Sequence, residues 1–180
     1  MFSKPASLAA ALAILSAGVT LAPSSVRAQD LAGYLGRHGY IAIQMTKLST
    51  GHETVKVTIN GVEGQFVVDS GAGGTVVHSA RLGKFSLQAP KGDGEVSSGA
   101  GGQTTMHRLP IRSFGIEGVT LDIEEIRTLD LTSVVDRLKS LAGADIDGVI
   151  GQDVLTRFNG VLDVGSQTLF LRATDEVEGR

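Results

Sequence analysis

The sequence predicts an all-β domain with one or two short helices. Residues 53–59 (ETVKVTI) alternate between apolar and polar side chains, which is the period of a strand with one buried face. Asn60 and Gly61 follow directly, and this pair favours the tight turn of a β-hairpin because both residues tolerate a positive φ. An apolar run at residues 65–68 then leads to Asp69. We therefore expect a hairpin whose second strand ends at Asp69.

The remaining segments continue this mostly extended pattern. Further strands are expected at residues 40–45, 109–114 and 119–127, with a last hairpin at 161–172. Residues 91–105 contain five glycines, two serines and two threonines, so they predict a mobile loop or the tip of a long hairpin. Two segments, 131–141 and 152–158, have the apolar spacing of short amphipathic helices.

Residues 1–28 have the pattern of a secretory signal peptide. A lysine near the start precedes an apolar run of fourteen residues, Leu8 to Leu21, and a small-x-small ending at 26–28. The run is shorter than the roughly 20 residues that a membrane-spanning helix needs, which disfavours the alternative of a retained anchor. Cleavage after Ala28 would leave one domain, residues 29–180, as a soluble periplasmic or secreted protein without a membrane partner.

Composition excludes several classes of function. The chain has no cysteine, which rules out disulfides, a lipoprotein anchor and cysteine catalysis. Removal of residues 1–28 changes the formal net charge from −3 to −5, and no basic cluster suggests nucleic acid as a partner. No Gly-x-Ser-x-Gly or phosphate-binding Gly-Lys-Ser/Thr motif occurs, and Gly71–Gly74 lacks the spacing of a dinucleotide-binding loop. The histidines are scattered, at His38, His52, His78 and His107, so neither a metal nor a cofactor is expected.

Asp69 has the surroundings that carboxylate chemistry requires. Two aspartates about 3 Å apart cannot both ionise, so they share one proton. The ionised member can then take a proton from a water molecule that attacks an amide, while the neutral member hydrogen-bonds the carbonyl oxygen. Such an aspartate belongs on a tight turn after a strand, with a hydroxyl such as Ser70 to brace the turn and a glycine such as Gly71 for close approach. The structural alternative is an Asx-turn at a strand end.

Two motifs resemble those of the retropepsin-like aspartic proteases. Asp69–Ala72 (DSGA) follows an apolar strand as in the signature of that family, and residues 149–155 (VIGQDVL) match its second element, two apolar residues and a glycine leading into a helix. The glycine-rich stretch Gly99–Gly102 falls where the family has its flap. The resemblance covers roughly residues 40–172 and implies a retropepsin-like acid-protease barrel.

The resemblance also implies roles for single residues. Asp69 would be catalytic, the active-site turn would contain Ser70, Gly71 and Ala72, and the substrate-binding flap would contain Gly99, Gly101 and Gly102. The chain departs from the family in its flap, which has no aromatic residue, in Gly73–Gly74 after the signature, and in an apparent insertion at 129–145.

One signature per chain implies a homodimer, since the second aspartate must come from another copy. Asp163 echoes the motif but lies one residue too far from Gly165, so we interpret it as a turn residue. Asp145 and Asp147 are expected to be solvated loop acids. The expected function is an aspartic endopeptidase that hydrolyses peptide bonds of a peptide or protein substrate through a water activated by paired Asp69 residues. The alternative is a catalytically silent, dimeric peptide- or polymer-binding domain of the same fold.

Overall fold

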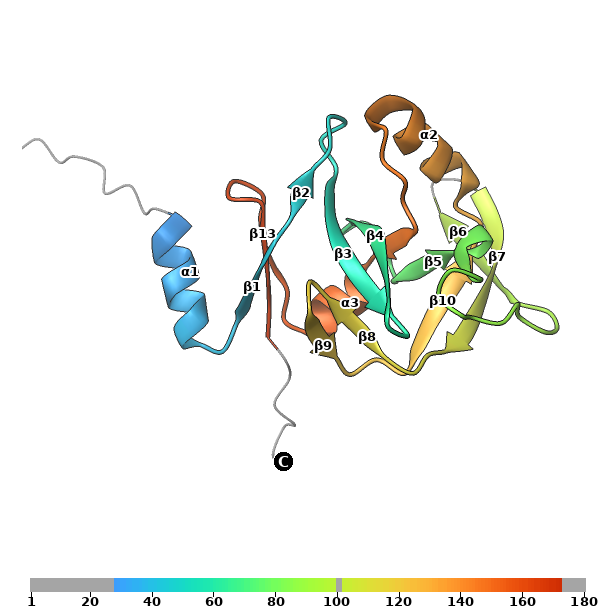
Figure 1. The fold of residues 1–180 in the computed structure, drawn as a ribbon, viewed down its shortest axis with the longest axis horizontal. Helices are drawn as coiled ribbons and strands as arrows, with labels where there is room; N and C mark the ends of the chain where they lie inside the picture. Colours follow the sequence, from blue (N-terminus) through green and yellow to red (C-terminus); the bar gives the residue numbers. More distant parts are fainter. Residues whose placement is uncertain (1–27, 100–101, 173–180) are drawn as a thin grey trace, which may run out of the picture.

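The computed structural model describes residues 28–99 and 102–172, which form mainly strands (Figure 1). In chain order the elements are α1 (Ala28–Arg37), β1 (Ile41–Gln44), β2 (Thr46–Lys47), β3 (Glu53–Ile59), β4 (Val62–Val68), β5 (Val76–His78), the 3-10 helix η1 (Ser79–Arg81), β6 (Glu95–Gly99), β7 (Gly102–Pro110), β8 (Phe114–Ile116), β9 (Val119–Leu121), β10 (Glu125–Leu129), α2 (Thr132–Ala142), β11 (Gly148–Ile150), α3 (Gln152–Arg157), β12 (Val161–Asp163) and β13 (Thr168–Leu171). The predicted all-β fold with few helices is therefore confirmed.

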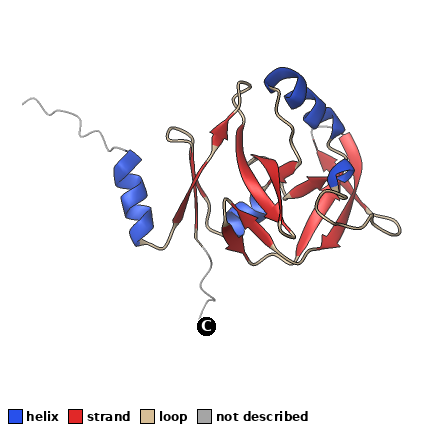
Figure 2. Ribbon diagram, viewed as in Figure 1, coloured by secondary structure: helices blue, strands red, loops and turns tan. Residues whose placement is uncertain are grey.

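The main sheet runs in the order β6-β7-β10-β5-β11-β4-β3-β8-β9, with β2 also paired to β3. Figure 2 shows its strands curving around a common interior, while α1 and α2 lie at the periphery. Large apolar side chains fill that interior, and Phe66, Phe85, Phe114 and Ile150 are almost completely buried. Burial of apolar side chains on this scale is the main source of stability in a domain without disulfides.

The hairpin of β3 and β4 forms where the sequence predicted it. Its turn residues, Asn60 and Gly61, have φ values of 53° and 84°. The Asn60 side chain also ties the turn to its surroundings, because Nδ2 donates to the Phe85 carbonyl at 3.0 Å and Oδ1 accepts from the Arg112 amide at 2.7 Å. The return strand β4 then brings the chain to Asp69.

The strands on the two sides of Asp69 are not neighbours in the sheet. β11 lies between them, parallel to β4 and antiparallel to β5. Gly148 makes this insertion possible, since a Cβ there would collide with the Phe66 ring and the Val76 carbonyl oxygen. The arrangement places the end of β11, and the helix that follows it, directly beside the Asp69 turn.

A smaller sheet, β1-β13-β12, stands beside the main sheet and has α1 along β1 (Figure 1). The sequence predicted β1 and the β12–β13 hairpin but not α1, whose glycines at Gly33 and Gly36 disfavour a helix.

The predicted signal peptide falls almost entirely on residues 1–27, outside the described residues. Within the described part of the chain, no helix has the length and apolarity to cross a membrane.

Two predicted strands are divided in the structure. The segment 109–114 contains the end of β7 and the start of β8, and 119–127 contains β9 and the start of β10. Pro110 has no amide hydrogen with which to continue the ladder. Beyond it, the Ile111 amide donates to the Glu124 carbonyl at 2.8 Å, which brings the two connecting segments together.

Candidate active site

Asp69 lies one residue beyond the end of β4, on a turn that backbone hydrogen bonds hold. Its amide donates to the Ile150 carbonyl at 3.0 Å, which extends the β4–β11 pairing to Asp69 itself. Carboxylate Oδ1 accepts from the Gly71 amide at 2.8 Å, and the Asp69 carbonyl accepts from the Ala72 amide at 3.1 Å. The side chain is exposed, and Oδ2 accepts no hydrogen bond from the described residues. The turn thus orients the carboxylate and leaves one oxygen free to react.

The two sequence motifs meet at this turn. The Gln152 amide donates to the Ala72 carbonyl at 2.8 Å, and Gln152 Nε2 donates to the Ser70 carbonyl at 2.6 Å. A Cβ on Gly151 would lie 2.5 Å from the Gly74 carbonyl carbon and 2.8 Å from the Ala72 oxygen. Only glycine therefore allows the start of α3 to approach the turn this closely.

Thr75 and Asp153 form a second connection between the motifs. Asp153 Oδ1 accepts from the Thr75 amide at 2.8 Å and from Thr75 Oγ1 at 2.7 Å. Thr75 Oγ1 in turn accepts from the Gly151 amide at 3.0 Å. Sequence reasoning missed both residues, although a threonine directly after the glycines and an aspartate inside the second motif were signals that could have identified them.

Ser70 does not brace the turn with its hydroxyl. Its side chain is exposed, and Oγ makes no hydrogen bond to any residue that the structure describes. The carbonyl of Ser70 is held instead, by Gln152. Within one chain, the bracing expected of the Ser70 hydroxyl is carried out by Thr75 and Gln152.

The glycine-rich segment forms a hairpin. β6 and β7 pair antiparallel up to Gly99 and Gly102, and Gly101 lies outside the described residues. β6 is the edge strand of the main sheet, so one side of its backbone has no partner strand among the described residues. This agrees with the prediction of a long hairpin tip.

The predicted insertion at 129–145 contains α2, which packs against β4. Val135 and Leu138 of α2 cluster with Val67, Ala144 and Ile146. The inserted helix therefore covers the face of β4 on which Val67 lies.

The expectation of a solvated Asp147 is wrong. Asp147 directly precedes β11 and is 1% exposed. Its Oδ2 accepts from the Gln65 amide at 2.9 Å and from Lys84 Nζ at 2.7 Å. A buried carboxylate needs such partners. The bond from Gln65 also ties β4 to the start of β11. Asp145 is exposed, as predicted.

Asp163 is a turn residue, as the sequence indicated. Its Oδ1 accepts from the amides of Gly165 and Ser166 at 3.0 and 3.2 Å, and Oδ2 accepts from Ser166 Oγ at 2.8 Å. The hydrogen bonds from the Ser166 side chain and amide lower the pKa of Asp163. Asp163 belongs to the smaller sheet, whereas Asp69 follows a strand of the main sheet.

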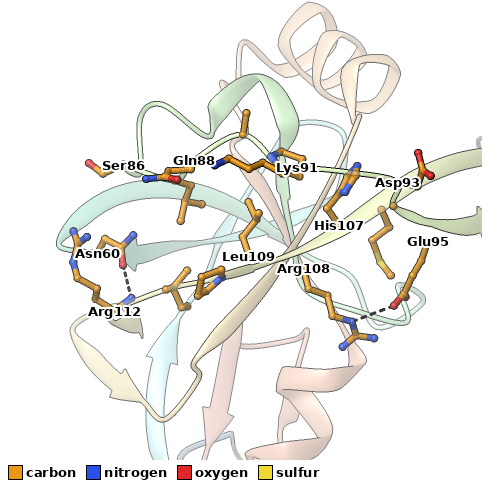
Figure 3. A pocket seen from close by; sticks show the side chains of 17 residues that line it. Asn60, Ser86, Gln88, Lys91, Asp93, Glu95, His107, Arg108, Leu109 and Arg112 are labelled. Atoms are coloured by element: carbon orange, nitrogen blue, oxygen red, sulfur yellow. Dashed lines mark hydrogen bonds and ion pairs between the residues drawn. The ribbon is translucent and has the colours of Figure 1, made fainter.

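A cavity of about 710 Å³ lies away from Asp69. It lies between β7 and the loop that precedes β6, with Lys91, His107 and Arg112 in its lining (Figure 3). None of the four residues Asp69 to Ala72 lines it. In the described ranges, no group of three or more histidine, aspartate or glutamate side chains is arranged to hold a metal ion.

Comparison with known proteins identifies the class. Residues 55–154, more than half of the 180 residues, match the family described as aspartyl protease. The chain belongs to this family, as its resemblance to the retropepsin-like members predicted.

Two solved structures are similar to this chain at low sequence identity. A retropepsin-like aspartic protease from Rickettsia conorii is 20% identical over 75% of this chain and 90% of its own, with a TM-score of 0.47. The EIAV protease in complex with the inhibitor HBY-793 is 19% identical over 62% of this chain and 91% of its own, with a TM-score of 0.46. A search of curated proteins returned no match.

Proposed function

We propose that this chain is one subunit of an exported, homodimeric aspartic endopeptidase that acts in the periplasm or outside the cell. The observation that carries the proposal is the exposed Asp69 carboxylate, oriented by the Gly71 amide at 2.8 Å and left with one free oxygen. Family membership supports the chemistry of aspartic proteases. The signal-like residues 1–28 support export.

The proposed reaction needs two Asp69 carboxylates that face each other. At a separation of about 3 Å they share one proton, so one is a base and the other an acid. The base takes a proton from a water molecule as the water attacks the scissile carbonyl, and the acid hydrogen-bonds the carbonyl oxygen. Asp163, whose surroundings echo the Asp69 motif, is occupied by hydrogen bonds within its own turn. A second copy of the chain is therefore the proposed source of the second carboxylate.

An extended peptide is the proposed substrate. β6 is an edge strand, and an edge strand can pair with an added peptide through main-chain hydrogen bonds. The hairpin that β6 forms with β7 would then act as the flap; Gly99 and Gly102 form its last described pair, and Gly101 lies outside the described residues. Main-chain pairing of this kind accepts many sequences, which suits a peptide or protein substrate.

A catalytically silent binding domain of the same fold is the second candidate. The bond between Asp69 Oδ1 and the Gly71 amide favours it, because this Asx-turn gives Asp69 a structural role that requires no reaction. Such a domain would still dimerise and hold a peptide or another polymer. A statine-type transition-state mimic separates the candidates, since only an enzyme should bind it far more tightly than a matched peptide.

The deciding experiment compares Asp69→Asn and Asp163→Asn in chain 29–180 on a casein-type substrate. Asparagine can keep the Gly71 hydrogen bond but cannot accept the proton from water, so Asp69→Asn should reduce cleavage to background. Asp163→Asn should keep normal turnover because its turn lies in the other sheet. Normal cleavage by Asp69→Asn would refute the catalytic role of Asp69 and the proposed aspartic protease mechanism. Export is tested separately, by N-terminal sequencing of the mature protein, which should begin near Gln29 rather than at Met1.

A further inference from the structure

Arg127 of β10 lies directly against the Asp69 turn. Its Nη1 donates to Asp153 Oδ2 at 2.5 Å, and its side chain is 24% exposed. The guanidinium also occupies the space where Gly74 lacks a side chain, since a Cβ on Gly74 would overlap Nη1 and lie 2.9 Å from Cζ. A side chain at position 74 would therefore require the guanidinium of Arg127 to move.

Asp153 transmits the position of Arg127 to the turn. While Oδ2 binds Arg127, Oδ1 accepts the two hydrogen bonds from Thr75 and a third from the Val154 amide at 2.8 Å. Hydrogen bonds with a charged partner are shorter and stronger than neutral ones. The Asp153 carboxylate is thus held by Arg127 through one oxygen and by Thr75 through the other. Thr75 in turn accepts a hydrogen bond from the Gly151 amide, next to the turn.

β10 connects this contact to the proposed flap. It pairs antiparallel with β7, where Arg127 is opposite Arg108, and parallel with β5, where Arg127 is opposite Val76. Like charges opposite each other repel, but each of these arginines lies close to a different acidic side chain. Arg108 is 3.7 Å from Glu95 of β6, and Arg127 binds Asp153. Arg127 therefore connects β10, the strand beside the β6–β7 hairpin, to the turn that bears Asp69.

We infer that Arg127 is a positioning residue for Asp69, acting through its ion pair with Asp153 and its packing on Gly74. This inference rests on the proposed function and deepens it. Two carboxylates that share a proton repel each other when both ionise, so something must hold them at a short separation. Loss of the Arg127–Asp153 ion pair and of the packing on Gly74 would loosen the turn, and the repulsion could then move the two carboxylates apart.

The test uses Arg127→Met, Arg127→Lys and a matched control, Arg157→Met. Arg157 is paired with Asp122 at 2.9 Å on the exposed side of α3 and has no hydrogen bond to the turn. Methionine keeps most of the apolar stem and removes the charge, whereas lysine can still pair with Asp153 but has no planar group to lie on Gly74. We expect Arg127→Met to lower kcat by about 100-fold with little change in KM, Arg127→Lys to recover part of the loss, and Arg157→Met to match the parent.

The pH dependence of kcat distinguishes positioning from simple destabilisation. Carboxylates that move apart interact less, so the two apparent pKa values of the pair approach each other and the bell-shaped profile becomes narrower. When the rate at each pH is divided by the folded fraction measured at that pH, a variant that is merely less stable keeps the width of the bell-shaped profile. An unchanged width in Arg127→Met would overturn the inference.

Amide exchange separates this inference from the proposed activity. The Gly71 and Ala72 amides both donate to Asp69, so they report directly on the turn. If the parent cleaves no substrate, the peptidase proposal fails, but the positioning of Asp69 is still measured by hydrogen exchange. Faster exchange of these two amides in Arg127→Met than in Arg157→Met supports the inference, and equal exchange refutes it.

Discussion

Replacement of Gly151 by alanine tests how closely the two motifs pack. The added Cβ would lie 2.5 Å from the Gly74 carbonyl carbon and oxygen and 2.8 Å from the Ala72 oxygen, and all of these are backbone atoms. Gly151 has φ −113° and ψ −171°, which alanine adopts without strain, so the cost is purely one of space. Overpacking typically lowers the free energy of unfolding by about 1–3 kcal/mol. Because the neighbours of this Cβ are backbone atoms, we expect Gly151→Ala to cost about 3 kcal/mol. For a domain of this size, that lowers Tm by about 6–12 °C.

Gly73→Ala is the matched control. Gly73 lies in the segment between β4 and β5 that Gly151 approaches, but a Cβ on Gly73 would have no atom within 4 Å. Thermal unfolding of both variants, at equal protein concentration so that any dimer contributes equally, should place Gly73→Ala within about 2 °C of the parent. Peptidase activity should also fall about 100-fold in Gly151→Ala alone, since the turn that carries Asp69 must shift. Equal melting temperatures for Gly151→Ala and the parent would refute the packing argument.

Three further predictions concern the surroundings of the site. Thr75→Val should lower stability by about 1–3 kcal/mol, because the buried Gly151 amide loses its acceptor, whereas Thr75→Ser should lose less; equal chemical denaturation midpoints would contradict this. Asp163, whose pKa is lowered from 3.8 by hydrogen bonds from Ser166, should contribute stability that is present above about pH 4 and is lost as the pH falls through the folded-state pKa. Asp163→Asn should therefore flatten the acid side of a Tm–pH curve, and an unaltered curve would count against those bonds. Amides of β6 and β7 should exchange more slowly when a peptide inhibitor binds, and unchanged protection would exclude a flap role for this hairpin.

The amino-acid sequence by itself determined the local elements around the site. Alternation over Glu53–Ile59 and the Asn60-Gly61 turn define the β3–β4 hairpin, because side-chain period and positive φ are properties of neighbouring residues. The same reasoning placed Asp69 at the end of a strand and located α2 and α3. Each of these features depends on interactions within about a dozen residues, which a linear pattern records.

Only the tertiary structure decided how distant segments meet at Asp69. β11 enters between β4 and β5 because Gly148 leaves room for it, and no local pattern encodes that neighbour. The burial of Asp147, expected to be solvated, likewise follows from partners on β4 and Lys84 that are far away in the sequence. Arg127 and Asp153 are 26 residues apart and look like ordinary surface charges in the sequence. They become part of the site because sheet pairing brings both to the turn, where burial and opposite charge make their contact favourable.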